Sequence, residues 1–474
     1  MVKQKPTKSH KASAHQTVTE EVKLHTGRET IKITTTEQKL SAHAGQVTFW
    51  AFVHLRRVRA LLAGLLPHRP TSPNALPPVE IALGFLAGVV TGAAKLAQVA
   101  WLRGDPVLPE IMAIERLPSQ PTLTRFFSFF KTAGSGGACW RGLWRWSMER
   151  LPSLRGGYAL DLDSTTLRHS GQRQEGVRTG YTPQGIKPCL HPLLAVLAEA
   201  KLCVQFWLRP GNSHSANNVV GFTLELLANL PKHLRLRVIR ADAGFQSEQW
   251  LALLAERGLR YIVAADFSGR LQRFVRRQTR WEPTPVPGTE VADEVYESIL
   301  PGNRARRYRL ILIRRRVDAP QRSGGKELLE CPGYRFQALL TNLPPRTSAF
   351  AIWADYNQRA DMENVIKELK QGFGLDQFCC RGFFATEAAL SLAVFAYNLS
   401  VLFARHLGWL EKQTIATLRY RLLHCAGIIS RSQGQLTLRL SLPIHARPWW
   451  RGIWEKLMSP FPNCNSVEQS PATS

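Results

Sequence analysis

The order of extended and helical segments between Gly157 and Ala265 constrains the fold most strongly. Apolar and polar residues alternate in Tyr158–Asp163, as in a strand with one buried face. The apolar segments 190–199 and 202–208 follow and predict a hairpin. Helical and extended segments then alternate: helix 217–230, strand 234–239, helix 246–257 and strand 261–265. This order predicts an α/β fold built on a mixed sheet.

The charge balance indicates a polyanionic partner. The 474 residues include 62 Lys and Arg against 35 Asp and Glu, a net charge of +27. Such an excess causes self-repulsion, and nucleic acid is the partner that best offsets it. A membrane is the weaker interpretation, because the clean apolar run 81–94 is shorter than the roughly 20 residues that a span needs. The run 388–404 contains Tyr397 and Asn398 and predicts a buried core helix.

Cysteine usage and the N-terminus indicate a reduced compartment. The eight cysteines show no C-x-x-C spacing, so neither a zinc site nor a disulfide framework is expected. The first residues lack the apolar stretch of a signal peptide. We therefore expect a cytoplasmic chain that makes no use of a membrane.

Changes in composition divide the chain into six parts. Residues 1–45, rich in Lys, Thr, Ser and His, predict a basic, mostly disordered arm. Helical spacing follows in 46–150, with one long helix expected at 79–102 and a break at 133–137. The remaining parts are an α/β region (151–268), a β-rich insertion with many Arg (269–350), a helical region (351–410) and a C-terminal region that is a candidate dimer contact (411–474).

Two carboxylates at strand ends could share a metal ion. Asp163 ends one predicted strand and Asp242 follows another. Hard oxygen ligands of this kind suit Mg²⁺, with phosphate and water completing the shell. Each Asp alone is more often a turn or cap residue. Asp161 shares a strand face with Asp163, and the residues leave open whether it is a ligand, a support for Asp163 or a buried paired carboxylate.

A third carboxylate is expected on a helix at 353–371. At about 100° per residue, four side chains fall within about 60° of one another on one face: Tyr356, Arg359, Glu363 and Lys370. Such a face offers one metal-binding carboxylate beside cations that bind phosphates. The structural alternative is a solvated face of salt bridges.

These residues resemble the signature of a known family. The spacing Tyr356-x2-Arg359-x3-Glu363-x6-Lys370 is similar to the Tyr-Arg-Glu-Lys signature of DDE insertion-sequence transposases of the IS-four superclass. Two further segments, at 208–212 and 119–126, are similar to its thirteen-eighty branch.

Two Asp blocks extend the likeness. Asp163-Ser-Thr165 resembles the family's first Asp block and Asp242-Ala-Gly-Phe245 its second, and the first match favours Asp163 over Asp161. The resemblance implies an RNase H-like core of mixed sheet, interrupted by the β-rich insertion and preceded by an all-helical DNA-binding domain. It also implies binding to terminal inverted repeats, cut-and-paste movement of a DNA element, a bacterial nucleoid-associated location and a homodimer on DNA.

The expected mechanism is two-metal phosphoryl transfer on double-stranded DNA. Asp163, Asp242 and Glu363 would hold two Mg²⁺ ions, for which Mn²⁺ substitutes. One ion would activate water and then the freed 3′-hydroxyl, and the other would stabilise the leaving oxygen. Tyr356, Arg359 and Lys370 are expected to contact phosphates near the cut.

Two further segments are expected to bind DNA. Thr122, Thr124 and Arg125 lie near the start of a helix that could enter a groove, the structural alternative being a capped helix that packs its Phe residues into a core. Arginines of the insertion, including Arg273, Arg276 and Arg277, are expected to supply salt-dependent affinity.

Two rival functions remain at this point. One is a metal-dependent nuclease without strand transfer, and the other is a non-catalytic repressor of the element's ends. In the family that this chain resembles, an aromatic residue on the last strand of the insertion can hold a flipped base when a DNA hairpin forms. Here that strand has Phe336 but no Trp, so the sequence does not decide whether a hairpin intermediate forms.

Overall fold

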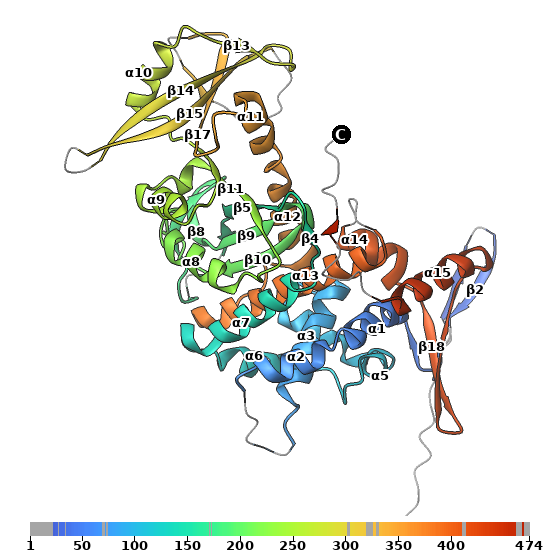
Figure 1. Ribbon diagram of the computed structural model, residues 1–474. Coiled ribbons are helices and arrows are strands. Elements are labelled where there is room, and N and C mark those ends of the chain that lie inside the picture. The colour runs from blue at the N-terminus through green and yellow to red at the C-terminus, as the bar shows by residue number, and fades with distance from the viewer. Residues whose placement is uncertain are drawn as a thin grey trace, which may run out of the picture.

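The computed structural model places a sheet-rich part above a helix-rich part (Figure 1). The residues it describes are 22–26, 28–33, 35–68, 72, 74–169, 171, 173–300, 304–318, 326–328, 331–409, 414–460 and 467–468.

A mixed sheet of ten strands forms the first part, which confirms the predicted α/β class. Three strands are parallel neighbours and the other pairs are antiparallel: β5 (Tyr158–Ser164), β11 (Leu236–Ala241) and β12 (Tyr261–Ala264). The predicted hairpin is β9 (Leu193–Leu197) with β10 (Leu202–Trp207), and it pairs with β5 through β9. Helices α8 (Val219–Asn229) and α9 (Glu248–Glu256) connect the strands as expected.

The strands of the 269–350 segment continue this sheet. After α10 (Gly269–Arg276), the chain forms five strands: β13 (Glu282–Pro283), β14 (Thr289–Leu300), β15 (Arg304–Arg316), β16 (Lys326–Glu327) and β17 (Tyr334–Thr341). β17 pairs with β12, so one ladder of hydrogen bonds joins this segment to the sheet. The chain then returns through α11 (Ala349–Asn357) to α12 (Ala360–Phe373).

The helical part begins with α1 (Val47–Leu55) and α2 (Val58–Leu65). The long helix predicted at 79–102 is wrong, because α3 (Pro78–Thr91) ends at Gly92 with φ +119°. The chain then bends by 101° into α4 (Leu96–Trp101). Short α5 (Leu108–Met112) and α6 (Gln120–Ser128) follow.

The break predicted at 133–137 is also wrong. Thr132 caps α7 (Ala133–Met148), its hydroxyl accepting a hydrogen bond from the Ser135 N–H. A good N-cap satisfies the free N–H groups of a first turn, and here it offsets the cost of the glycines in that turn.

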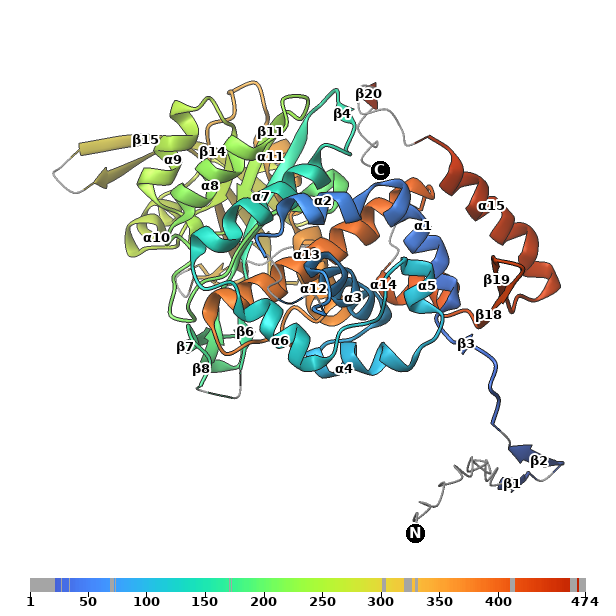
Figure 2. The same ribbon diagram turned by 90° about the horizontal axis from the view of Figure 1, so that it is seen from below.

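Helix α13 (Phe383–His406) forms the centre of the helical part (Figure 2). Among the described residues it is the one unbroken helix long and apolar enough to cross a membrane, and 89% of its apolar window is buried within the protein. Among the polar side chains that this helix buries is that of Asn398, whose amide is hydrogen-bonded to the backbone. Its amide accepts from the Cys203 N–H at 3.0 Å and donates to the Cys203 carbonyl at 2.7 Å. The prediction of a buried core helix is thereby confirmed. The Asn398 amide pairs with the backbone of β10 at the outer edge of the sheet.

The N-terminal and C-terminal regions of the chain contact each other. Residues 1–21 of the predicted basic arm lie outside the described residues, and the described part of 22–41 includes β1 (Val22–His25), β2 (Thr30–Ile33) and β3 (Leu40–Ser41). β3 pairs with β18 (Gly427–Ser432), which pairs with β19 (Gln435–Leu440). α15 (Arg447–Met458) contacts α1 and buries Trp450.

A carboxyl group at the start of α13 is expected to make stability depend on pH. Glu387 accepts a hydrogen bond from the Leu208 N–H at 3.0 Å, and burial raises the pKa of Glu387 to about 7. The folded protein therefore holds a proton that the unfolded chain releases above its ordinary pKa of 4.5, so stability falls as pH rises from about 4.5 to 7.

Glu387→Gln keeps the acceptor oxygen and removes the titration. The difference in unfolding free energy between variant and wild type should grow across that window, by at most about 3 kcal/mol. Urea denaturation at pH 5, 6, 7 and 8 measures it. A difference that does not change with pH would contradict the assignment.

Candidate active site

The register of two parallel strands brings the two predicted aspartates to one edge of the sheet. Arg240 of β11 lies opposite Asp161 of β5, and Ala241 lies opposite Leu162. Asp163 and Asp242 are the next residues along each strand. The side chains of Asp161 and Arg240 lie on the same side of the sheet, where they pair with each other. Since side chains two residues apart share a strand face, Asp163 and Asp242 also leave the sheet on one side.

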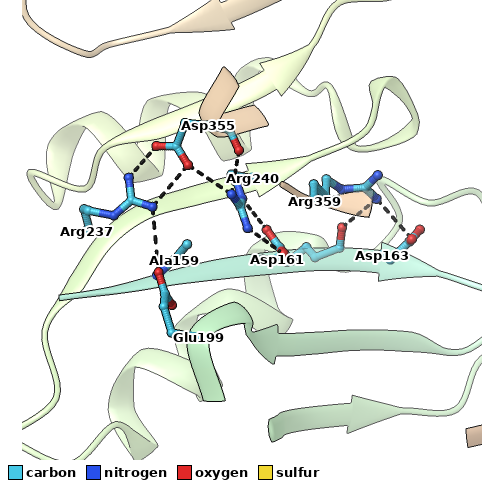
Figure 3. Close-up of polar contacts among 9 residues, drawn as sticks. Ala159, Asp161, Asp163, Glu199, Arg237, Arg240, Asp355 and Arg359 are labelled. Atoms are coloured by element: carbon cyan, nitrogen blue, oxygen red, sulfur yellow. Dashed lines mark hydrogen bonds and ion pairs between the residues drawn. The ribbon is translucent and has the colours of Figure 1, made fainter. Parts of the chain in front are cut away.

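Asp163 is a buried carboxylate among several charges. Its side chain pairs with Arg359 at 3.1 Å (Figure 3) and accepts from the Ser164 N–H at 2.8 Å. Burial raises the pKa of Asp163 to about 6. Arg359 opposes this rise, while the carboxylates of Asp242 and Glu363 add to it. The three predicted acids are therefore electrostatic neighbours.

Asp242 has a local role as well. It caps the short 3-10 helix η4 (Ala243–Phe245), and its carboxylate accepts from the Gly244 N–H at 2.9 Å. The hydroxyls of Ser164 and Ser215 lie 2.8 Å apart and tie the segment after Asp163 to the segment before α8. Cap and candidate ligand are thus the same residue, so the two interpretations of Asp242 do not exclude each other.

The helix predicted at 353–371 is two helices. α11 ends at Asn357 and α12 begins at Ala360, with Arg359 as its N-cap residue. The break turns Arg359 toward the sheet, where it also donates to the Leu162 carbonyl at 3.1 Å. Glu363 lies in the first turn of α12 and is exposed to solvent.

A pocket of about 390 Å³ lies between the end of β5 and α12. Its lining includes Asp163 and Glu363 with two cations of the same helix face, Lys367 and Lys370. Lys367 is not among the residues predicted from the sequence, although its spacing of four residues from Glu363 indicates this face. Asp376, which follows α12 and also lines the pocket, gave no such signal.

The other two signature residues lie nearby. Burial raises the pKa of Tyr356 to about 12, and the residues that influence it next are Arg359, Asp242 and Asp163. Lys370 donates to the Thr166 carbonyl at 3.1 Å, and burial lowers its pKa while Asp376 and Asp163 raise it. All four signature residues thus lie close enough to Asp163 to interact with it electrostatically.

Asp161 belongs to a buried ion-pair network (Figure 3). Its carboxylate accepts two hydrogen bonds from Arg240, at 2.6 and 2.8 Å, and both side chains are almost fully buried. Arg240 and Arg237 both pair with Asp355 of α11. Of the alternatives that the sequence left open, the structure shows Asp161 as a buried paired carboxylate.

Comparison with known proteins shows the family. Residues 24–459 match the family model described as Transposase DDE domain group 1. This chain belongs to that family. It is therefore a DDE transposase, an enzyme of nucleic-acid phosphoryl transfer with DNA as its partner.

Other comparisons add little to this. One similar solved structure is the cryo-EM structure of the piggyBac transposase synaptic complex with hairpin DNA. It is 13% identical, with a TM-score of 0.40, and the match covers 91% of this chain and 87% of that one. No curated protein sequence matches.

The transposase's carboxylates fit a divalent cation in their chemistry, since Asp and Glu oxygens are the hard ligands that Mg²⁺ takes. Burial raises the pKa of Asp163 and the carboxylates of Asp242 and Glu363 add to the rise, and a bound cation would oppose both effects. Within the described ranges, however, no three His, Cys, Asp or Glu side chains are arranged to hold a metal ion. The cation that the structure places beside Asp163 is the Arg359 guanidinium, at 3.1 Å.

The residues predicted to bind DNA elsewhere lie on the surface. Thr124 and Arg125 of α6 are exposed, whereas Thr122 is partly buried and its hydroxyl lies 2.8 Å from that of Ser119. The same helix buries Phe126 and Phe127, as its structural alternative required. Three arginines on or just after α10 are exposed: Arg273, Arg276 and Arg277.

The Asp161–Arg240 pair is expected to control stability. Arg240→Met leaves a buried carboxylate without its partner and should lower the unfolding free energy by about 3–5 kcal/mol. Replacing both partners, as Asp161→Leu with Arg240→Met, should recover much of that loss.

Urea denaturation of the three proteins measures this. Arg307→Met is the matched control, because Arg307 pairs with Glu297 on the surface, where such pairs are worth about 1 kcal/mol or less. A double variant no more stable than Arg240→Met alone would show that the unpaired charge is not the cause.

Proposed function

We propose that this transposase cuts both ends of its own DNA element and joins them to target DNA, a cut-and-paste reaction. We place it in the IS-four superclass, nearest the thirteen-eighty branch, on the spacing of Tyr356, Arg359, Glu363 and Lys370. The observation that carries the proposal is the buried Asp163 carboxylate, for which Asp242 and Glu363 are near charges at one edge of the sheet.

The sheet supports an RNase H-like core. The order β10–β9–β5–β11–β12 combines an antiparallel hairpin with parallel strands, and Asp163 lies near the end of β5 while Asp242 directly follows β11. Residues 151–268 and 351–410 would form this core, with 269–350 as the insertion.

Asp163, Asp242 and Glu363 would hold two Mg²⁺, or Mn²⁺ in their place. The ions would supply an activated water or hydroxyl and stabilise the leaving oxygen. Arg359 pairs with Asp163, and a cation bound at that carboxylate would leave the guanidinium of Arg359 free to grip a phosphate. Lys367 and Lys370 add positive charge along the same pocket wall, and Tyr356 brings a phenol that burial keeps protonated at neutral pH.

The ends of the element would be recognised elsewhere on the surface. Thr124 and Arg125 project from α6, so its packing against the core leaves a polar face for base edges, with Thr122 holding the first turn. Arg273, Arg276 and Arg277 would contribute non-specific, salt-dependent affinity. Two ends must be cut together, so we propose a homodimer on DNA, with 411–474 as a contact between copies.

Cleavage assays with paired variants of α12 test the proposal. Glu363→Gln should lower Mg²⁺-dependent nicking of the element's ends by more than 100-fold, because changing even an outer-shell partner of a metal ligand costs about 10- to 100-fold. Asp361→Asn is the matched control: it is exposed, lies two residues away and is absent from the pocket lining. End binding, measured by gel shift, should change little in either variant.

The substrates are duplexes that cover the DNA on each side of the gene. A Glu363→Gln protein that nicks as fast as Asp361→Asn would refute the assignment of Glu363. A second assay offers a pre-cleaved end and a target plasmid. Joined products support transposition, whereas nicking without joining would show a nuclease, and binding without nicking a repressor.

A further inference from the structure

An exposed hairpin beside the pocket carries two large apolar side chains that the proposed reaction does not use. It consists of β7 (Arg178–Thr182) and β8 (Gly185–Leu190), and it forms an edge of the molecule (Figure 2). Tyr181 and Ile186 are paired across the two strands, with 83% and 70% of their surfaces exposed. Leaving such an apolar pair in water indicates a binding surface.

The hairpin is firmly held at its base. Gly180 packs so closely on the Gly211 carbonyl that a side chain there would collide with it. The Cys189 thiol lies 3.6 Å from the same carbonyl, and Leu190 forms a bridge with Pro210. This explains the Leu-Arg-Pro-Gly-Asn segment at 208–212, which supplies the backbone on which the hairpin rests.

The buried residue of that segment fixes the base further. Arg209 donates to the carbonyls of His191, His214 and Asn217, at 2.8–2.9 Å. Gly180 and Cys189 face Gly211, and successive side chains of a strand point to opposite faces. Tyr181 therefore projects from the face opposite to Gly211, and its cross-strand partner Ile186 projects beside it.

The hairpin is continuous with the wall of the pocket. β6 (Leu167–Arg168) pairs with β8 and follows Thr165 and Thr166. Thr165 lines the pocket, and the Thr166 carbonyl accepts from Lys370. With a strand rise of roughly 3.3 Å per residue, the five residues of β7 extend about 16 Å from this junction. A DNA strand in the pocket would thus lie within reach of the hairpin.

The charge of the hairpin favours DNA as its partner. Residues 178–190 contain no Asp or Glu, while Arg178 and Lys187 are both exposed. Arg168 at the base is exposed as well. Aromatic side chains flanked by cations are the usual means of holding unstacked bases, since every base has a face on which an aromatic ring can stack.

We propose that Tyr181 stacks on an unpaired base of the DNA end next to the cut, with Ile186 supporting the base from the neighbouring strand. This inference rests on the proposed function. It assigns the hairpin as a second DNA-contact site, separate from the Tyr-Arg-Glu-Lys face. A second copy of the protein is the competing occupant.

Photo-crosslinking tests the proposal. Duplex ends carrying a single 5-iododeoxyuridine at successive positions around the mapped cut are irradiated with the full-length protein, and tryptic peptides are analysed by mass spectrometry. The tryptic peptide that begins at Thr179 extends to Lys201, because Lys187 precedes proline, and Tyr181 is its one Tyr, Phe or Trp. We expect an adduct on Tyr181 at positions next to the cut.

Variants provide the controls. Tyr181→Ala should lose the adduct and weaken end binding by roughly 5- to 100-fold, the range for loss of one stacking residue. Tyr181→Phe, which keeps the aromatic ring, is the matched control and should retain both the adduct and the end binding.

Wild-type protein that cuts the duplexes but forms no adduct on Tyr181 at any position overturns the inference and leaves the proposed function intact. So does a change in the sedimentation of DNA-free protein on Tyr181→Ala, which would assign the hairpin to a contact between copies. Wild-type protein that cuts none of the duplexes contradicts the proposed function itself.

Discussion

The buried ion pair between Asp161 and Arg240 is the interaction on which the site depends. It joins the two central parallel strands two residues before the candidate acids, Asp163 and Asp242. Asp355 extends it to α11, so the helix that leads into α12 is held against the same sheet edge. A buried pair of this kind adds little net stability over an apolar pair, but it is costly to break. We infer that its value lies in fixing register and helix position.

The carboxylate cluster that this frame holds is unfavourable by itself. Asp163 is buried near two like charges, and burial together with these charges raises its pKa. Arg359 offsets part of that cost by its ion pair with Asp163. In the proposed reaction the same guanidinium would serve twice, first as a counter-ion of Asp163 and then as a phosphate ligand. In the same proposal, DNA would contact both the pocket and the β7–β8 hairpin.

Much of this could be predicted from the sequence, for physical reasons that also explain the errors. Alternation, strand-end aspartates and helical spacing are local patterns, and they correctly located the mixed sheet and brought Asp163 and Asp242 to one edge. The errors arise from local backbone features that the spacing of apolar residues does not reveal. These are the left-handed Gly92 that ends α3, the Thr132 cap that allows α7 to begin with glycines, and the break between α11 and α12 at Arg359. The partner of Asp161 could not be read either, because Arg240 meets it only through strand register. Whether the predicted site residues act as assigned remains a prediction.

The most direct test of the central claim, that Asp163, Asp242 and Glu363 converge on divalent cations, is anomalous diffraction from crystals of the transposase bound to an element end and Mn²⁺. The account predicts manganese peaks within bonding distance of all three carboxylates, with Arg359 moved from Asp163 to a phosphate. Ordered DNA in the pocket, with Arg359 still paired to Asp163 and no manganese beside the three acids, would contradict it.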